Sequence, residues 1–224
     1  ADVTLTDRTL YKDGKWNTIC LPFDVTLAGS ALNGATARPL TAASISGTTL
    51  NLTFGDAVNT LEAGTPYIIK WDGDGTSNIE NPVFEGVTIE TTKHDYDTNK
   101  ESVTTDERVR FVGTYKSTAF DAEDQSILLM GGSNTLYYPQ SGASIGAQRA
   151  YFKIGSDDAE APAFITSFNI NFGDDEATGI ISVHDSGFMV NGSDAWYTLD
   201  GRKLQGKPTQ RGIYINNGKK TIIK

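Results

Sequence analysis

The sequence predicts an all-β protein: an antiparallel β-sandwich, of jelly-roll or immunoglobulin-like order, followed by a small C-terminal β-hairpin or meander tail. Three observations support this prediction. Apolar residues recur at every second position in several short runs, as in strands with one buried and one solvated face. Turn-forming residues separate these runs. No segment shows the 3.6-residue apolar period of a convincing amphipathic helix.

The clearest predicted strand covers residues 164–172, where apolar and polar residues alternate. Phe164, Phe168 and Phe172 share one face of this strand, whereas a helix would scatter them around its circumference. Comparable strand-like runs occupy residues 50–54, 67–71, 109–115, 127–130 and 151–154.

The composition changes after Phe172, and this change sets the predicted domain boundaries. Residues 173–179 are rich in acids, lack an apolar period and end in glycine, which is typical of a linker. Beyond them, short strand-like runs alternate with Asp-Gly and Asn-Gly pairs, which favour type I′ hairpin turns. We therefore expect a sandwich domain over residues 1–172, a linker over 173–179 and a small β tail over 180–224.

Charge and hydropathy exclude several classes of protein. The formal net charge is −9, with 19 Lys and Arg scattered among 28 Asp and Glu, so no basic surface for nucleic acid is expected. No run approaches the roughly 20 apolar residues of a membrane-spanning helix. The chain starts at Ala1 directly in strand-like sequence, so any signal peptide is expected upstream of it.

The nucleophiles in the sequence lack the context that catalysis needs. Residues 142–146 match G-x-S-x-G, but a nucleophile elbow requires a helix after the serine, and residues 150–154 predict a strand. Cys20 lies in an apolar run and is far in sequence from His94 and His184, so we expect a buried thiol. We predict no enzymatic activity.

Acidic residues supply only weak candidates for a metal site. Asp72 and Asp74 resemble the start of a calcium loop, but Val83 stands where an EF-hand loop places its bidentate glutamate. An acidic hairpin turn is the favoured interpretation, and we expect no cofactor. The acid clusters at 106–107 and 121–124 lie in polar surroundings typical of solvated surface.

Aromatic residues supply the candidate ligand-binding residues. Trp71 ends a predicted strand beside an acidic turn, and exposed rings of this kind stack on sugars. Tyr137 and Tyr138 are adjacent, so in a strand they point to opposite faces and one is more exposed. Most aromatic side chains of β proteins are core residues, and that alternative stays open for all three.

The C-terminal residues carry a resemblance to a known family. Residues 196–204, 206–209 and 212–220 read WYTLDGRKL, GKPT and GIYINNGKK. They resemble the C-terminal sorting domain of Por-type (type IX) secretion cargo in Bacteroidetes, which often ends in a Gly-(Ile/Val)-Tyr strand, a turn and a basic strand. The resemblance implies that the tail serves export or surface attachment.

The larger part is also similar to a known module. Residues 15–23 (KWNTICLPF), 63–71 (AGTPYIIKW) and 142–152 (GASIGAQRAYF) resemble runs in an uncharacterised extracellular β module of Bacteroidetes surface proteins. The resemblance implies a secreted or outer-membrane surface location and a structural, adhesive or display role, with a glycan or another surface protein as partner. A carbohydrate-binding module using exposed aromatics is the alternative, and a glycan-active enzyme is the third reading.

Overall fold

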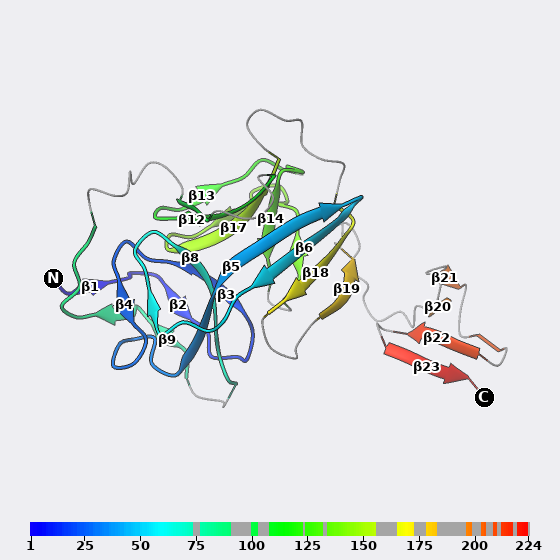
Figure 1. The fold of residues 1–224 in the computed structure, drawn as a ribbon, viewed down its shortest axis with the longest axis horizontal. Coiled ribbons are helices and arrows are strands. Elements are labelled where there is room, and N and C mark those ends of the chain that lie inside the picture. Colours follow the sequence, from blue (N-terminus) through cyan, green and yellow to red (C-terminus); the bar gives the residue numbers. More distant parts are fainter. Residues whose placement is uncertain are drawn as a thin grey trace. The chain divides into compact units, whose positions relative to one another are not determined.

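The chain is described by a computed structural model that forms two compact units, Ala1–Ser186 and Gly187–Lys224. Every regular element in the described residues is a β-strand, which confirms the all-β prediction (Figure 1). None of these residues forms a helix long and apolar enough to cross a membrane. The described residues are 1–73, 77–90, 100–102, 108–122, 124–131, 134–155, 165–172, 178–182, 196–198, 203–204, 208–209, 212–216 and 219–223.

The first unit is built on two large sheets. The six-stranded sheet has the order β19–β18–β6–β5–β8–β3. Its strands are β3 (Asn17–Cys20), β5 (Ala35–Ser46), β6 (Thr49–Phe54), β8 (Pro66–Trp71), β18 (Ser167–Asn171) and β19 (Thr178–Ser182). The five-stranded sheet has the order β11–β12–β17–β14–β15. Its strands are β11 (Lys100–Ser102), β12 (Val109–Thr114), β14 (Ile127–Met130), β15 (Leu136–Tyr137) and β17 (Arg149–Ile154).

Four two-stranded ribbons accompany these sheets. Three of them come from the N-terminal part of the chain, and the fourth joins two segments near the five-stranded sheet. The ribbons pair β1 (Val3–Thr4) with β10 (Val83–Phe84), β2 (Thr9–Leu10) with β9 (Ile79–Glu80), β4 (Val25–Thr26) with β7 (Thr60–Leu61), and β13 (Thr118–Ala119) with β16 (Ser144–Ile145).

The predicted antiparallel pairing is found throughout the large sheets except between β6 and β18, which run parallel. Hydroxyl and amide pairs reinforce this contact on the polar face: the Thr49 and Ser167 hydroxyls are 2.7 Å apart, and Asn169 Nδ2 donates to Asn51 Oδ1 at 2.8 Å. The two strands are far apart in sequence, so their parallel pairing needs no tight hairpin.

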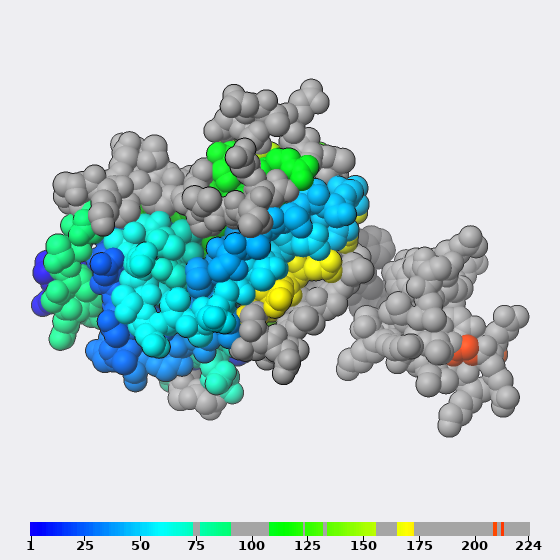
Figure 2. All heavy atoms as spheres, viewed as in Figure 1, coloured from blue at the N-terminus to red at the C-terminus, as the bar shows by residue number. Residues whose placement is uncertain are grey.

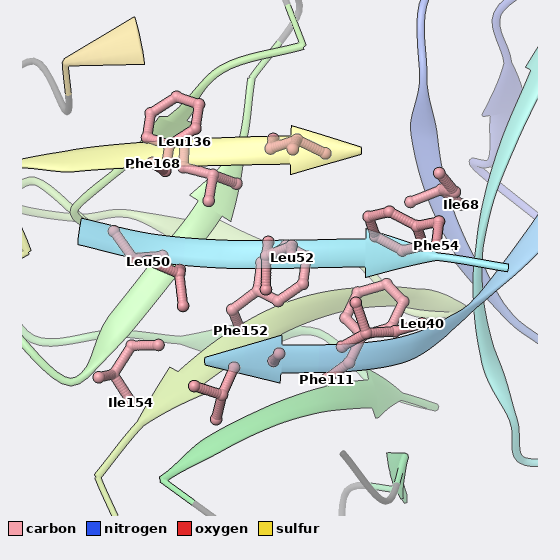
Figure 3. Close-up of a cluster of buried hydrophobic side chains, with 14 of the residues drawn as sticks. Leu40, Leu50, Leu52, Phe54, Ile68, Phe111, Leu136, Phe152, Ile154 and Phe168 are labelled. Carbon is pink, nitrogen blue, oxygen red and sulfur yellow. The ribbon is translucent and has the colours of Figure 1, made fainter. Parts of the chain in front are cut away.

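The main core lies between the two large sheets (Figure 3). Leu50, Leu52 and Phe54 of β6 face residues of the opposite sheet such as Phe111 and Phe152. The Phe111 and Phe152 rings are stacked with their centroids 4.7 Å apart. An alternating strand buries one row of side chains, and two facing rows fill the space between the sheets.

The strand predicted from residues 164–172 supplies one row of this core. Phe168, Ile170 and Phe172 are buried in it, while Asn169 stays on the polar face. Phe172 stacks on Trp16 with a centroid distance of 5.4 Å. The alternation in the sequence therefore identified the buried face correctly from Ser167 onward, where β18 begins. It was wrong at the start of the predicted strand, where Ile165 is buried and Thr166 is exposed, and Phe164 lies outside the described residues.

Each large sheet is also partly covered on its outer face. On β8, Ile68 points into the main core while Tyr67 and Ile69 belong to a second cluster beneath the N-terminal ribbons. This double burial explains why residues 67–71 are mostly apolar instead of alternating. The N-terminal ribbons gather at one end of the unit, the end whose atoms are coloured from dark blue to blue-green in Figure 2.

The second unit is a four-stranded sheet with the order β21–β20–β22–β23, in which all pairs are antiparallel. Its strands are β20 (Trp196–Thr198), β21 (Lys203–Leu204), β22 (Gly212–Asn216) and β23 (Lys219–Ile223). The tail is thus a small antiparallel sheet containing the hairpins β20–β21 and β22–β23, in line with the predicted hairpin tail. It is not a simple meander, because β22 pairs with β20 and not with β21.

The boundary between the units differs from the expected one. Thr178 and Gly179, placed in the predicted linker, belong to β19, which pairs with the edge of β18. That pairing satisfies backbone groups that an open sheet edge would leave exposed. The first unit accordingly extends to Ser186. The rest of the predicted linker, 173–177, lies outside the described residues.

Candidate ligand-binding site at the seam between the sheets

Two of the three candidate aromatic residues are core residues. Trp71 is 4% exposed, and its Nε1 donates to the Asn33 carbonyl at 3.0 Å. Tyr138 is 5% exposed; its hydroxyl donates to the Ile165 carbonyl at 3.1 Å and accepts the Ile165 N–H at 2.9 Å. A buried ring cannot stack on a sugar, so neither residue forms part of an exposed aromatic platform.

Tyr137 differs from its neighbour. It is half-buried and packs at the margin of a third apolar cluster, on the outer face of the five-stranded sheet, whereas Tyr138 lies in the main core. The two adjacent side chains thus point to opposite faces, as the sequence predicts, and the more exposed of the two is Tyr137. It remains a candidate for contact with a ligand.

The acidic candidates are dispersed in the described residues. Asp72 is exposed, and Asp74 lies outside the described part of the chain. Within the described ranges no three Asp, Glu, His or Cys side chains are grouped as metal ligands. Asp124 closes a local turn, since its Oδ1 accepts the Ser126 N–H at 2.8 Å and the Ser126 hydroxyl at 2.6 Å.

The G-x-S-x-G segment is part of the sheet structure. Ser144 lies in β16, and the strand predicted after Gly146 is confirmed as β17. Gln148 has a positive φ of 54°, which turns the chain into β17. The predicted burial of Cys20 is confirmed at 0% exposure. His94 and His184 lie outside the described residues.

Beside this segment, the edge of the six-stranded sheet is hydrogen-bonded to the five-stranded sheet. We call this junction the seam. Strand β3 ends the six-stranded sheet, and its free side meets the start of β17. The Ala150 N–H donates to Thr18 Oγ1 at 3.0 Å, and the Cys20 N–H donates to the Gln148 carbonyl at 3.3 Å. These bonds fix Thr18 and β17 relative to each other.

A cavity of about 270 Å³ opens along the seam. Its polar lining consists of Asn17, Thr18, Tyr137, Ser144 and Arg149, and its apolar lining comes from neighbouring residues of β14, β16 and β17. Arg149 is half-buried on the outer face of the sheet, next to the inward-facing Ala150. The cavity therefore combines one cation, two hydroxyl groups, an amide and an aromatic ring.

A second arginine lies directly behind the cavity wall. Arg8 is only 4% exposed, and its Nη2 donates to the carbonyl oxygen of Thr18 at 3.0 Å. Its Nε and Nη1 are buried and have no hydrogen-bond acceptor among the described residues. Buried arginines are normally paired with acids, so two unused donors on one guanidinium are unusual.

The electrostatics of this pair are those of a positively charged pocket. Burial, and next the nearby Arg149 guanidinium, lower the pKa of Arg8 to about 9, against an opposing effect of Tyr11. Burial also lowers the pKa of Arg149, opposed by Tyr11 and Tyr137. The charged and phenolic groups that influence Arg8 are Arg149 and Tyr11, and those that influence Arg149 are Tyr11 and Tyr137; no carboxylate of the described residues is among them. A pKa near 9 leaves Arg8 protonated at pH 7.

A larger cavity, of about 460 Å³, lies near the N-terminal ribbons and carries Asp24, Glu85 and Glu90 in its lining. The Asp24 carboxylate accepts the Ala63 N–H at 2.6 Å, and the nearby Asp2 carboxylate accepts the Gly86 N–H at 2.9 Å. These two carboxylates hold loops together, which is a structural role. The seam is consequently the candidate site.

Sequence reasoning did not single out Arg8 or Arg149. Arg8 stands in the polar run TDRTLY, where an exposed side chain is the ordinary expectation, and Arg149 directly precedes the residues 150–154 that predict a strand. Only the meeting of β3 and β17 brings them together. Comparison with protein-family models, with curated proteins and with solved structures finds no match to the chain.

Proposed function

We propose that this chain is a non-enzymatic module of a secreted or outer-membrane surface protein, with a structural, adhesive or display role. The observation that supports this best is the extent of apolar packing: one cluster fills the space between the two large sheets, and two more cover parts of their outer faces. Such a sandwich is a rigid scaffold that presents its loops and edges to partners.

The C-terminal unit, Gly187–Lys224, is the part we assign to export or surface attachment. It is a compact unit separate from the sandwich, and its sequence carries the sorting-domain resemblance. A tail of this kind can be removed without breaking the pairing of β18 with β19.

The experiment is deletion of residues 187–224 in a Bacteroidetes host, with a flexible Gly-Ser tail of equal length as the matched control. We expect both proteins to keep the thermal unfolding of the first unit and to lose most of their surface-exposed fraction, measured by protease accessibility on intact cells. An unchanged surface fraction would contradict the assignment.

A second function, glycan binding, is favoured by the half-buried Tyr137 beside Arg149 in the seam cavity. A ring next to hydroxyl, amide and guanidinium groups offers both stacking and hydrogen bonds to a sugar. The test is a glycan array probed with the full chain and with Tyr137→Ala. We expect the full chain to retain glycans and Tyr137→Ala to retain markedly less. If neither protein retained any glycan, this function would be excluded.

A further inference from the structure

We propose that the seam cavity binds the carboxylate group of an acidic saccharide, with Arg149 contacting the carboxylate and Arg8 supporting the negative charge from behind the wall. The inference deepens the glycan-binding function above and is independent of the surface-module function. It rests on the geometry of Arg8, Thr18 and Arg149 described at the seam.

The first argument is the missing counter-ion. The chain has 28 Asp and Glu against 19 Lys and Arg, so acids are abundant. Among the described residues, however, the Arg8 guanidinium donates to a carbonyl, and its other two nitrogens have no acceptor and thus no carboxylate. Burying unpaired positive charge costs free energy, and an anion from solution would offset that cost.

The second argument is the position of the donors. Thr18 is held on one side by the Ala150 N–H and on the other by Arg8 Nη2, so the buried guanidinium is fixed against the cavity wall. Arg149 lies in that wall, next to Gly146. A Cβ atom at position 146 would lie only 3.4 Å from Arg149 Nε. The planar guanidinium fork matches the two oxygens of a carboxylate.

The third argument selects the kind of anion. A net charge of −9 repels a multiply charged phosphate more strongly than a singly charged carboxylate. The rest of the lining, Asn17, Ser144 and Tyr137, offers an amide, a hydroxyl and a phenol ring, which suit the hydroxyl groups and the ring face of a sugar. At about 270 Å³ the cavity is at the small end of ligand pockets, so we expect a single sugar unit.

The test uses the full chain titrated with D-glucuronate, D-glucose and acetate at constant ionic strength, followed by NMR chemical shifts or calorimetry. We expect glucuronate to bind at least about tenfold more tightly than glucose or acetate, because only it presents both the carboxylate and the ring. Equal affinity for glucose and glucuronate would overturn the role of the carboxylate. Equal affinity for acetate and glucuronate would overturn the role of the sugar.

Variants assign the effect to the seam. Arg149→Gln should weaken glucuronate binding by about tenfold or more, and Arg149→Lys, which keeps the charge but loses the fork, should weaken it less. Arg110→Gln is the matched control, because Arg110 is another half-buried arginine of the same sheet outside the cavity. A similar loss for Arg110→Gln, or no binding of any probe, would overturn the inference. If neutral glycans still bound through Tyr137 in that case, the glycan-binding function would hold while the proposed carboxylate site would be wrong.

Discussion

Strand β17 carries very different side chains on its two faces, one of which lies in the main core and the other at the seam. Toward the core, Ala150 and Phe152 are buried among apolar residues, with the Phe152 ring stacked 4.7 Å from that of Phe111. One residue before Ala150, Arg149 points to the opposite face and lines a polar cavity with buried Arg8 behind it. The main core holds one donor without an acceptor, the neutral Trp16 Nε1, whereas the seam holds two on a single buried cation, Arg8 Nε and Nη1.

This difference separates residues that stabilise the fold from residues that cost it stability. Burying an aromatic side chain favours folding by a few kcal/mol. Burying a guanidinium without a counter-ion opposes folding, because the charge loses its hydration. A fold that retains such a charge can recover the cost by binding an anion, which is why we propose the seam as the binding site.

The largest expected effect is in the core. Phe152→Ala removes a fully buried ring from between the sheets and should lower the free energy of unfolding by about 3–5 kcal/mol. Urea unfolding followed by tryptophan fluorescence measures it. Tyr137→Ala, on the outer face, is the control and should cost clearly less. A cost for Phe152→Ala below about 1 kcal/mol would contradict the packing described for the core.

The next effect concerns a hydrogen-bonded residue at the edge of the core. Tyr138→Phe keeps the ring but leaves the Ile165 N–H and carbonyl without their partner, at a cost of about 1–3 kcal/mol. Tyr11→Phe, at a ring that is 42% exposed, should change the free energy of unfolding by less than about 0.5 kcal/mol. Equal effects of the two substitutions would show that the Tyr138 hydroxyl has no structural role.

A smaller effect, of opposite sign, is expected at the seam. Arg8→Met removes the buried charge and retains most of the side-chain volume, so without ligand it should raise the free energy of unfolding by on the order of 1 kcal/mol. The gain is reduced because the Thr18 carbonyl loses its donor. Chemical denaturation at pH 7 in a buffer without carboxylates is the measurement. A destabilised variant would mean that Arg8 serves the fold.

The smallest effect is a pH dependence. Burial raises the pKa of Tyr138 above 10, against the effect of its bond to Ile165. The folded state thus holds this proton more tightly than the unfolded chain, so the stability it contributes is complete below pH 10 and falls as the pH rises through the folded pKa. Tyr138→Phe should show a shallower decline of stability above pH 10. Parallel declines in the two proteins would contradict the burial of the phenol.

Much of the fold could be predicted because burial leaves a period in the sequence. The alternation of Leu50, Leu52 and Phe54, and of Phe168, Ile170 and Phe172, identified core-facing rows that the structure brings together. The parallel pairing of β6 with β18 left no such signal, because which strands become neighbours is decided by the tertiary fold. The same holds for β19, whose polar beginning resembled a linker.

The candidate site was harder to predict for a related reason. Trp71 and Tyr138 were chosen for their chemistry, and the second cluster and the main core bury them. Tyr137 is the one predicted residue that lines the seam cavity. Arg8 is buried although its sequence neighbours are polar, because the chain folds it against β3, and no local pattern encodes that contact.

The most direct test of the seam compares thermal unfolding of the wild type and of Arg8→Met at increasing D-glucuronate. A ligand that binds only the folded state raises stability by RT ln(1 + [L]/Kd). The wild-type midpoint should begin lower and climb with glucuronate, while the Arg8→Met midpoint should begin higher and climb less, because Arg149 still contacts the carboxylate. An Arg8→Met midpoint that begins lower than the wild type, or climbs as steeply, would contradict the account of the seam as an anion site.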